Sequence, residues 1–207
     1  MIGGSLTEVL SLVLAPAVTR RRDTWFKEVA EALEEAERKI DGFSVESLTQ
    51  DEAFVSAVIE ATRSAISTHK DEKRDALRNG LLNIALHRST NEDQQQTFFR
   101  YIDELTVWHM RILKLFQNPI EQVSARDPYV TTSYTGGAPV QIIRIVYPEL
   151  YEKQELYQQL VSDLYNRGLF NADSKVLHIT MTADGMFAKR TTVLADDFLA
   201  FIANPIA

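Results

Sequence analysis

Histidines are the residues of this chain best suited to metal or acid–base chemistry, and there are four: His69, His87, His109 and His178. A zinc protease needs two histidines four residues apart around a Glu, and a di-iron helix needs a His three residues after a Glu. None of the four has either spacing, and no two of them are paired at helical spacing. A metal site would need partners brought together by the fold alone, so we predict no metal-binding residues.

His109 is the most conspicuous histidine because it lies on the apolar stripe of a helix predicted for residues 92–116. There it could act as a general base or a pH-sensitive switch. Alternatively, it is a neutral buried side chain bonded to a nearby backbone or hydroxyl group. We expect the second role, because buried polar side chains are normally hydrogen-bonded.

Other catalytic motifs are absent. The chain has no cysteine, which excludes disulfides, thiolate metal sites and a cysteine nucleophile. It has no phosphate-binding Gly-x-x-x-x-Gly-Lys-Ser/Thr loop, no Gly-x-Gly-x-x-Gly and no Gly-x-Ser-x-Gly. We therefore predict a non-enzymatic protein with no catalytic residues and no cofactor. An enzyme whose site is assembled only by the fold is the third hypothesis.

Helices are predicted for most of residues 1–120, because apolar residues recur there at steps of three and four. We expect a short helix that closes near Pro16 and further helices over about residues 19–40, 50–68, 70–85 and 92–116. Gly80 lies inside the fourth of these, where it either breaks the helix or admits a close neighbour. Together these helices are predicted to form a helical bundle.

The composition changes after the bundle. Residues 121–139 are rich in Ser, Thr, Gly and Pro, including Gly136-Gly137, and predict a flexible linker. From residue 140 to 207 we expect a helix that begins at Pro148 and ends at Arg167-Gly168, and two strands, 177–182 and 186–190. Asp184-Gly185 would form the hairpin turn between them, and Thr192 would cap the last helix.

This tail resembles the end of bacterial winged-helix domains, in which a helix closes on Arg-Gly-Leu, a wing follows and a Thr-capped helix finishes the fold. The matching residues are Leu164, Arg167, Gly168, Leu169, Asp184, Gly185 and Thr192. The whole chain also resembles a group of uncharacterised bacterial helical proteins, through segments 68–73 and 103–106. The predicted fold class is thus mainly α: an N-terminal helical bundle (1–120), a linker (121–139) and a small winged-helix-like α+β module (140–207).

Charge argues against nucleic acid as the partner of this module. A DNA-reading helix needs Arg, Lys, Asn or Gln on its exposed face and avoids acids. The chain has a net charge of -7, and the helix before the predicted wing carries the acids Glu152, Glu155 and Asp163. Its glutamines, Gln154, Gln158 and Gln159, could read bases, but the surface lacks the cations that attract phosphates. If the module does bind nucleic acid, the contacts would come from four cations that the fold would have to bring together: Lys189, Arg190, Arg126 and Arg144.

The leading hypothesis is a non-enzymatic interaction or regulatory protein of unknown pathway, whose winged-helix-like module contacts an unknown protein partner. A homo-oligomer is compatible with this hypothesis. The alternative is a DNA-binding transcription regulator that uses the bundle as a sensor or dimerisation unit.

The longest uncharged apolar stretch, residues 9–18, has about half the length that a membrane-spanning helix needs. Arg20, Arg21 and Arg22 follow it, whereas a secretory signal has its basic residues first. We therefore predict a cytoplasmic protein without a membrane partner. The alternative is an interfacial amphipathic segment with the Arg cluster at headgroup level.

Overall fold

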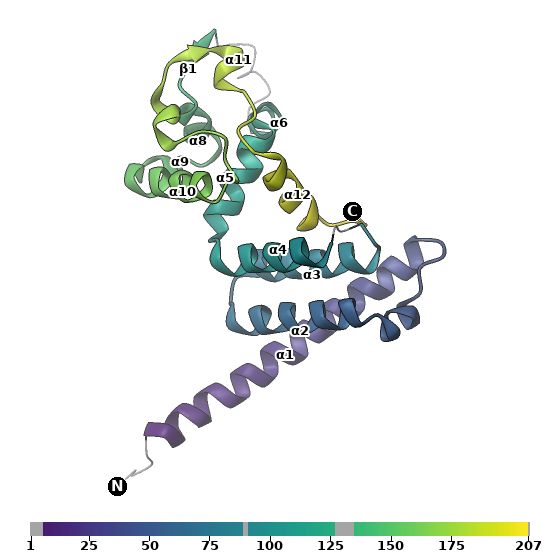
Figure 1. The fold of residues 1–207 in the computed structure, drawn as a ribbon. Helices are drawn as coiled ribbons and strands as arrows, with labels where there is room; N and C mark the ends of the chain where they lie inside the picture. Colours follow the sequence, from purple (N-terminus) through teal and green to yellow (C-terminus); the bar gives the residue numbers. More distant parts are fainter. Residues whose placement is uncertain (1–5, 89–90, 127–134, 207) are drawn as a thin grey trace. The chain divides into compact units, whose positions relative to one another are not determined.

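The computed structural model describes residues 6–88, 91–126 and 135–206, and it is mainly helical with a small two-stranded sheet (Figure 1). The chain forms two compact units. The first unit comprises residues 1–104 and 201–207, and the second comprises residues 105–200. These bounds differ from the predicted ones at residues 120 and 140.

Helix α1 runs without interruption from Leu6 to Lys39. The predicted helix end near Pro16 is therefore wrong. A proline inside a helix removes the bond to the carbonyl four residues earlier, at a cost of about 3 kcal/mol. Pro16 and Leu12 are both exposed, so water can bond the freed carbonyl. Beyond the proline, α1 contributes an apolar stripe to the first unit: Trp25, Val29, Leu33 and Ala36.

Three more α-helices complete the first unit: α2 (Glu52–Ser67), α3 (Asp71–Ala85) and α4 (Glu92–Glu104). A short 3-10 helix, η1 (Val45–Gln50), precedes α2. The helices meet over fully buried side chains such as Ala61, Leu81 and Phe98. The indole Nε1 of Trp25 donates to Thr62 Oγ1 at 2.9 Å, which satisfies the one polar atom of that buried ring.

The last residues of the chain return to α3. Gly80 makes this possible, because a Cβ at this position would lie 2.6 Å from a ring carbon of Phe201. The side-chain amides of Asn79 and Asn83 donate to the carbonyl oxygens of Ile202 and Phe201, each at 2.9 Å. Gly80 thus admits a close neighbour, and α3 is not broken.

The single helix predicted for residues 92–116 is wrong, because the chain breaks at Leu105 and Thr106 into α4 and α5 (Val107–Gln117). Thr106 and His109 form a capping box, in which the Thr106 side chain accepts from the His109 backbone and the His109 ring accepts from Thr106 N. These bonds satisfy donors at the start of α5. The apolar periodicity continues across the break, so it gives no signal of it.

The second unit contains α5 and a series of short elements: α6 (Pro119–Ser124), β1 (Gly136–Gly137), α8 (Val140–Val146), α9 (Pro148–Tyr151), α10 (Gln154–Asn166), η2 (Ser174–His178), β2 (Met181–Thr182), α11 (Ala183–Met186) and α12 (Val193–Phe201). The last residue of α12 belongs to the first unit. Phe116 and Phe170 stack edge to face in this unit, with ring centroids 5.3 Å apart.

Residues 121–139 are not a simple linker. The first of them continue α6, and Gly136–Gly137 pairs antiparallel with Met181–Thr182. A Cβ at Gly136 would lie 2.6 Å from the carbonyl oxygen of Met181, so glycine permits the strand contact. The predicted flexible connector at these two glycines is therefore wrong. Residues 127–134 of the predicted linker lie outside the described residues.

The tail keeps two of its predicted features and loses others. The helix predicted from Pro148 is divided into α9 and α10 around Glu152 and Lys153. Its end is as predicted, with Gly168 at φ 71°, and Thr192 Oγ1 accepts from Ala195 N at the start of α12.

The predicted hairpin is wrong, because Thr182 caps α11 and places Asp184 and Gly185 inside this short helix. The predicted strands 177–182 and 186–190 are wrong too. The first is replaced by the end of η2 and the two residues of β2, which pairs with β1, and no strand forms over the described residues 186–190. An isolated antiparallel bridge joins Phe170 and Thr191.

Candidate interaction surfaces

Helix α10 lies in the segment that the sequence predicted to be the helix before a wing. Its apolar stripe is buried, and the opposite side exposes Glu155, Gln159 and Asn166 with Asp163 half-buried beside them. There is no Lys or Arg from Gln154 to Asn166. The exposed face of α10 is thus acidic and amide-rich.

One flank of α10 is covered by η2. Ser162 Oγ donates to Ser174 Oγ at 3.0 Å, and Gln158 Nε2 lies 3.0 Å from His178 Nε2. The Tyr157 hydroxyl lies 3.4 Å from the same His178 nitrogen, and burial raises the pKa of this tyrosine. The chain itself therefore occupies a flank that a reading helix would have to insert into a DNA groove.

Lys189, one of the four cations predicted as nucleic-acid contacts, forms an ion pair with Asp196. Asp196 also accepts from Thr191 Oγ1 at 2.8 Å and from Gln117 Nε2 at 3.2 Å. Burial alone would raise the pKa of Asp196, but the bonds from Lys189, Thr191 and Gln117 outweigh it and lower the pKa. The Lys189 charge is therefore already compensated within the unit.

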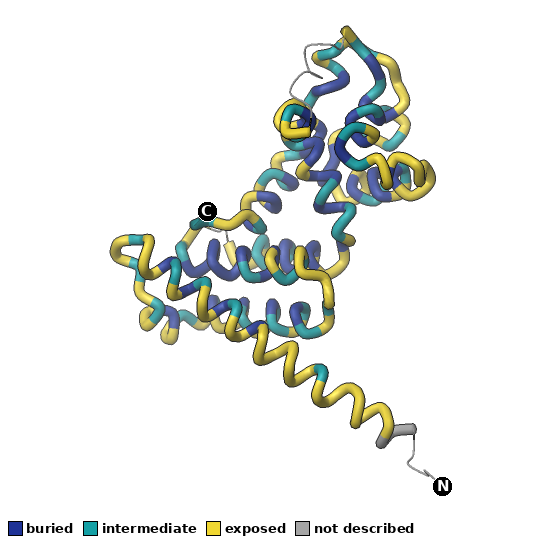
Figure 2. Tube along the Cα trace, turned by 180° about the vertical axis from the view of Figure 1, so that it is seen from behind, coloured by how far each residue is buried: buried dark blue, intermediate teal, exposed yellow. Residues whose placement is uncertain are grey.

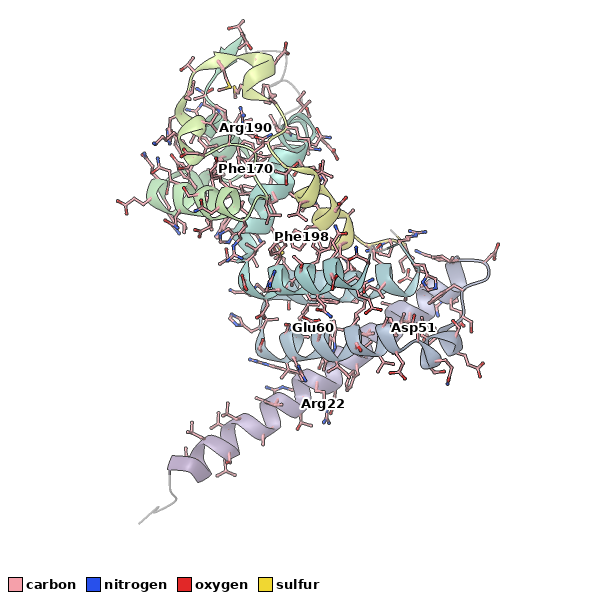
Figure 3. All side chains as sticks on the ribbon, in the orientation of Figure 1. Arg22, Asp51, Glu60, Phe170, Arg190 and Phe198 are labelled. Carbon is pink, nitrogen blue, oxygen red and sulfur yellow. The ribbon has the colours of Figure 1, made fainter. Side chains whose placement is uncertain are left out.

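Arg190 is only 7% exposed and lies near Phe170 (Figure 3). Its Nη2 donates to the carbonyl oxygen of Gly185 at 2.8 Å, and burial lowers the pKa of the guanidinium. It cannot reach a phosphate without leaving this environment. The other two predicted contacts, Arg126 and Arg144, are exposed. Arg144 lies on α8 and Arg126 lies two residues past the end of α6, and α6 and α8 pack against each other.

The four histidines have different surroundings. His109 Nδ1 accepts from the Thr106 backbone N–H at 3.0 Å, the local bond expected of a structural histidine, and its Nε2 lies 3.6 Å from Asp163 Oδ2. His69 and His87 are exposed, and His178 rests on α10. Among the described residues, no three His, Asp or Glu side chains are grouped as a metal ion would need.

A polar pocket of about 500 Å³ lies between α2 and α4 in the first unit. Its lining includes three carboxylates and one guanidinium: Glu60, Asp93, Asp103 and Arg100. Burial raises the pKa of Glu60, and Arg63 opposes this shift. Raised carboxylate pKa values occur at functional sites, but none of the lining residues pairs a nucleophile with a base.

An apolar groove of about 300 Å³ lies between α1, η1 and α2, with Val55 and Ile59 exposed on its rim. Sequence reasoning missed this groove. The signal was present, because Val55, Ile59 and Ile66 form a second apolar stripe on α2 beside the buried one.

The most exposed apolar surface lies on the N-terminal half of α1, which Figure 2 shows exposed along most of its length. Six large apolar side chains there are 44–76% exposed: Val9, Leu10, Leu12, Val13, Leu14 and Val18. Within the described part of the chain, no helix has the length and apolar character needed to cross a membrane.

Comparisons of the chain with protein-family models, with curated proteins and with solved structures find no match.

Proposed function

We propose that this is a non-enzymatic interaction or regulatory protein of the bacterial cytoplasm, whose winged-helix-like second unit contacts a protein through α10. One observation carries the proposal: α10 has no Lys or Arg and exposes Glu155 and Gln159. Nucleic-acid affinity comes largely from cations that neutralise phosphates. A helix without cations, placed against a phosphate backbone, would be repelled by it.

The flanks of this face favour a protein partner. Leu156 and Tyr165 are 39% and 46% exposed on the two sides of the acidic face. Tyrosine and apolar anchors surrounded by polar groups are typical of protein interfaces. A partner with basic or hydrogen-bond-donating side chains around an apolar patch would complement this surface.

The alternative function is a transcription regulator that binds DNA with the second unit. It has weaker support, because Lys189 is paired with Asp196 and Arg190 is buried. Of the four cations that this function requires, Arg126 and Arg144 are exposed, and within the described residues they are neither buried nor paired as Arg190 and Lys189 are.

Fluorescence anisotropy with a labelled duplex separates the two functions. We expect no binding to random duplex DNA tighter than about 10 μM at physiological salt. Micromolar or tighter binding with a steep salt dependence would replace the proposal by the regulator. If the regulator function is correct, this DNA binding should be lost in the Arg126→Ala/Arg144→Ala variant. It should be kept in Lys27→Ala/Lys70→Ala, which removes the same charge from the first unit.

A further inference from the structure

The exposed apolar side chains of α1 surround the helix rather than line one side of it. At 100° per residue, the six side chains from Val9 to Val18 cover about two-thirds of the circumference. Leu12 and Leu10 lie almost opposite each other. A helix that packs on one protein surface needs an apolar stripe only a little more than about 100° wide. This stretch therefore suits an apolar medium that can enclose it better than a single protein face.

The charges around this stretch have the sign that attracts an anionic surface. Residues 1–22 contain three of the chain's 22 basic residues and one of its 29 acidic residues, so this end is positive on an otherwise acidic protein. Arg20 and Arg21 follow the apolar stretch on the same sides of the helix as Val13 and Leu10. Arg21 donates to the carbonyl oxygen of Ile66 at 3.0 Å. Arg20 has no partner among the described residues, and Arg22 stays half exposed beside Asp23.

The length of the stretch limits how deep it can go. Ten helical residues rise about 15 Å, roughly half of the hydrocarbon thickness of a bilayer. Inserted end-on to that depth, the stretch would carry Glu8, which directly precedes it, toward the bilayer centre, where a carboxylate is costly. The helix is therefore placed along the interface, with the apolar side chains toward the acyl chains and the arginines at the level of the headgroups. Apolar residues flanked by arginines at this depth are the features of helices that bind membrane interfaces.

We propose that the N-terminal half of α1 docks into the surface of an anionic lipid membrane, with Val9–Val18 in the acyl region and Arg20 and Arg22 among the headgroups. This proposal concerns the first unit and does not depend on a protein contact through α10. A second copy of the chain is the competing occupant. It fits less well, because one partner helix would leave either Leu12 or Leu10 in water.

Vesicle co-sedimentation of the full chain tests the proposal. Vesicles of phosphatidylcholine with about 30% phosphatidylglycerol are compared with pure phosphatidylcholine, at about 0.1 M and about 0.5 M salt. Leu10→Gln/Leu14→Gln removes two exposed apolar side chains and keeps helix propensity. Val55→Gln/Ile59→Gln is the matched control, with the same spacing and similar exposure on α2. Arg20→Gln/Arg22→Gln tests the charge.

We expect binding to the anionic vesicles that weakens at high salt. It should fall at least tenfold in Leu10→Gln/Leu14→Gln and roughly thirtyfold in Arg20→Gln/Arg22→Gln, and stay unchanged in the control. Absence of binding to the anionic vesicles, or equal loss in the control, would overturn the proposal. The proposal would also be overturned if the chain does not bind vesicles but forms a dimer in analytical ultracentrifugation, and Leu10→Gln/Leu14→Gln makes it monomeric. The occupant of this surface would then be a second copy of the chain.

Discussion

Lys73 Nζ donates to the backbone carbonyl oxygen of Asp103 at 2.7 Å. The bond connects the first turn of α3 to the C-terminal end of α4, where a cation is favoured by the helix dipole. Burial lowers the pKa of Lys73, and the Asp103 carboxylate opposes this shift. Segments 68–73 and 103–106, which carry the resemblance to uncharacterised bacterial proteins, therefore meet at the end of α4. Their contact has a structural role.

Replacing Lys73 by Met should remove this bond and leave a carbonyl of α4 without its donor. We expect the free energy of unfolding to fall by about 1–2 kcal/mol. Bonds to charged groups are worth about 1.5–3 kcal/mol, and water can partly replace this exposed one. Urea unfolding measures the change. Lys70→Met is the control, because Lys70 is exposed one turn earlier. Equal losses in the two variants would contradict the role given to Lys73.

Gly80→Ala should destabilise the first unit although alanine is the better helix former. The propensity gain is about 1 kcal/mol, and the overpacking against the Phe201 ring costs about 1–3 kcal/mol. In a Phe201→Leu background, which removes the ring, the same change should be neutral or stabilising. Thermal unfolding of the four proteins gives this double-mutant cycle. A Gly80→Ala variant more stable than the natural chain would refute the close contact.

His109→Gln and His109→Leu should differ at one amide. Glutamine three residues after a Thr N-cap can complete a capping box, whereas leucine cannot. We expect hydrogen exchange of the Thr106 amide to stay slow in His109→Gln and to become faster in His109→Leu. If both variants keep the amide protected, the ring of His109 does not cap α5.

The lowered pKa of Asp196 predicts that the stability of the fold depends on pH. Its folded pKa lies below its ordinary value of 3.8, so the deprotonated form stabilises the fold above that value. This stabilisation is lost as the pH falls through the folded pKa. The difference in unfolding free energy between the natural chain and Asp196→Asn should be largest near neutral pH and shrink below about pH 4. Asp41→Asn, at an exposed position, should show no such trend in urea unfolding.

The sequence was sufficient for features that arise from neighbouring residues. The stripes of apolar residues identified Trp25, Leu81 and Phe98 as core, and all three are buried. Gly168 and Thr192 correctly predicted the end of α10 and the N-terminal cap of α12. These signals are local because a helix and its caps are made within a few residues.

Features that depend on distant parts of the chain could not be predicted. Gly136 pairs with Thr182, and Phe201 packs on Gly80, across separations that periodicity does not report. The burial of Arg190 has no sequence signal, because its partner is the backbone carbonyl of Gly185. The acidic character of α10 was readable from composition, whereas its cover by η2 was not.

Site-specific photo-crosslinking in cells tests the proposed protein contact most directly. A photoreactive phenylalanine analogue replaces Gln159 on the exposed face of α10, and a second variant carries it at Asp75, which is exposed on α3. We predict a discrete protein adduct from position 159 that nuclease does not remove, and none from position 75. No adduct at position 159, or an adduct that nuclease removes, would contradict the proposal that α10 contacts a protein.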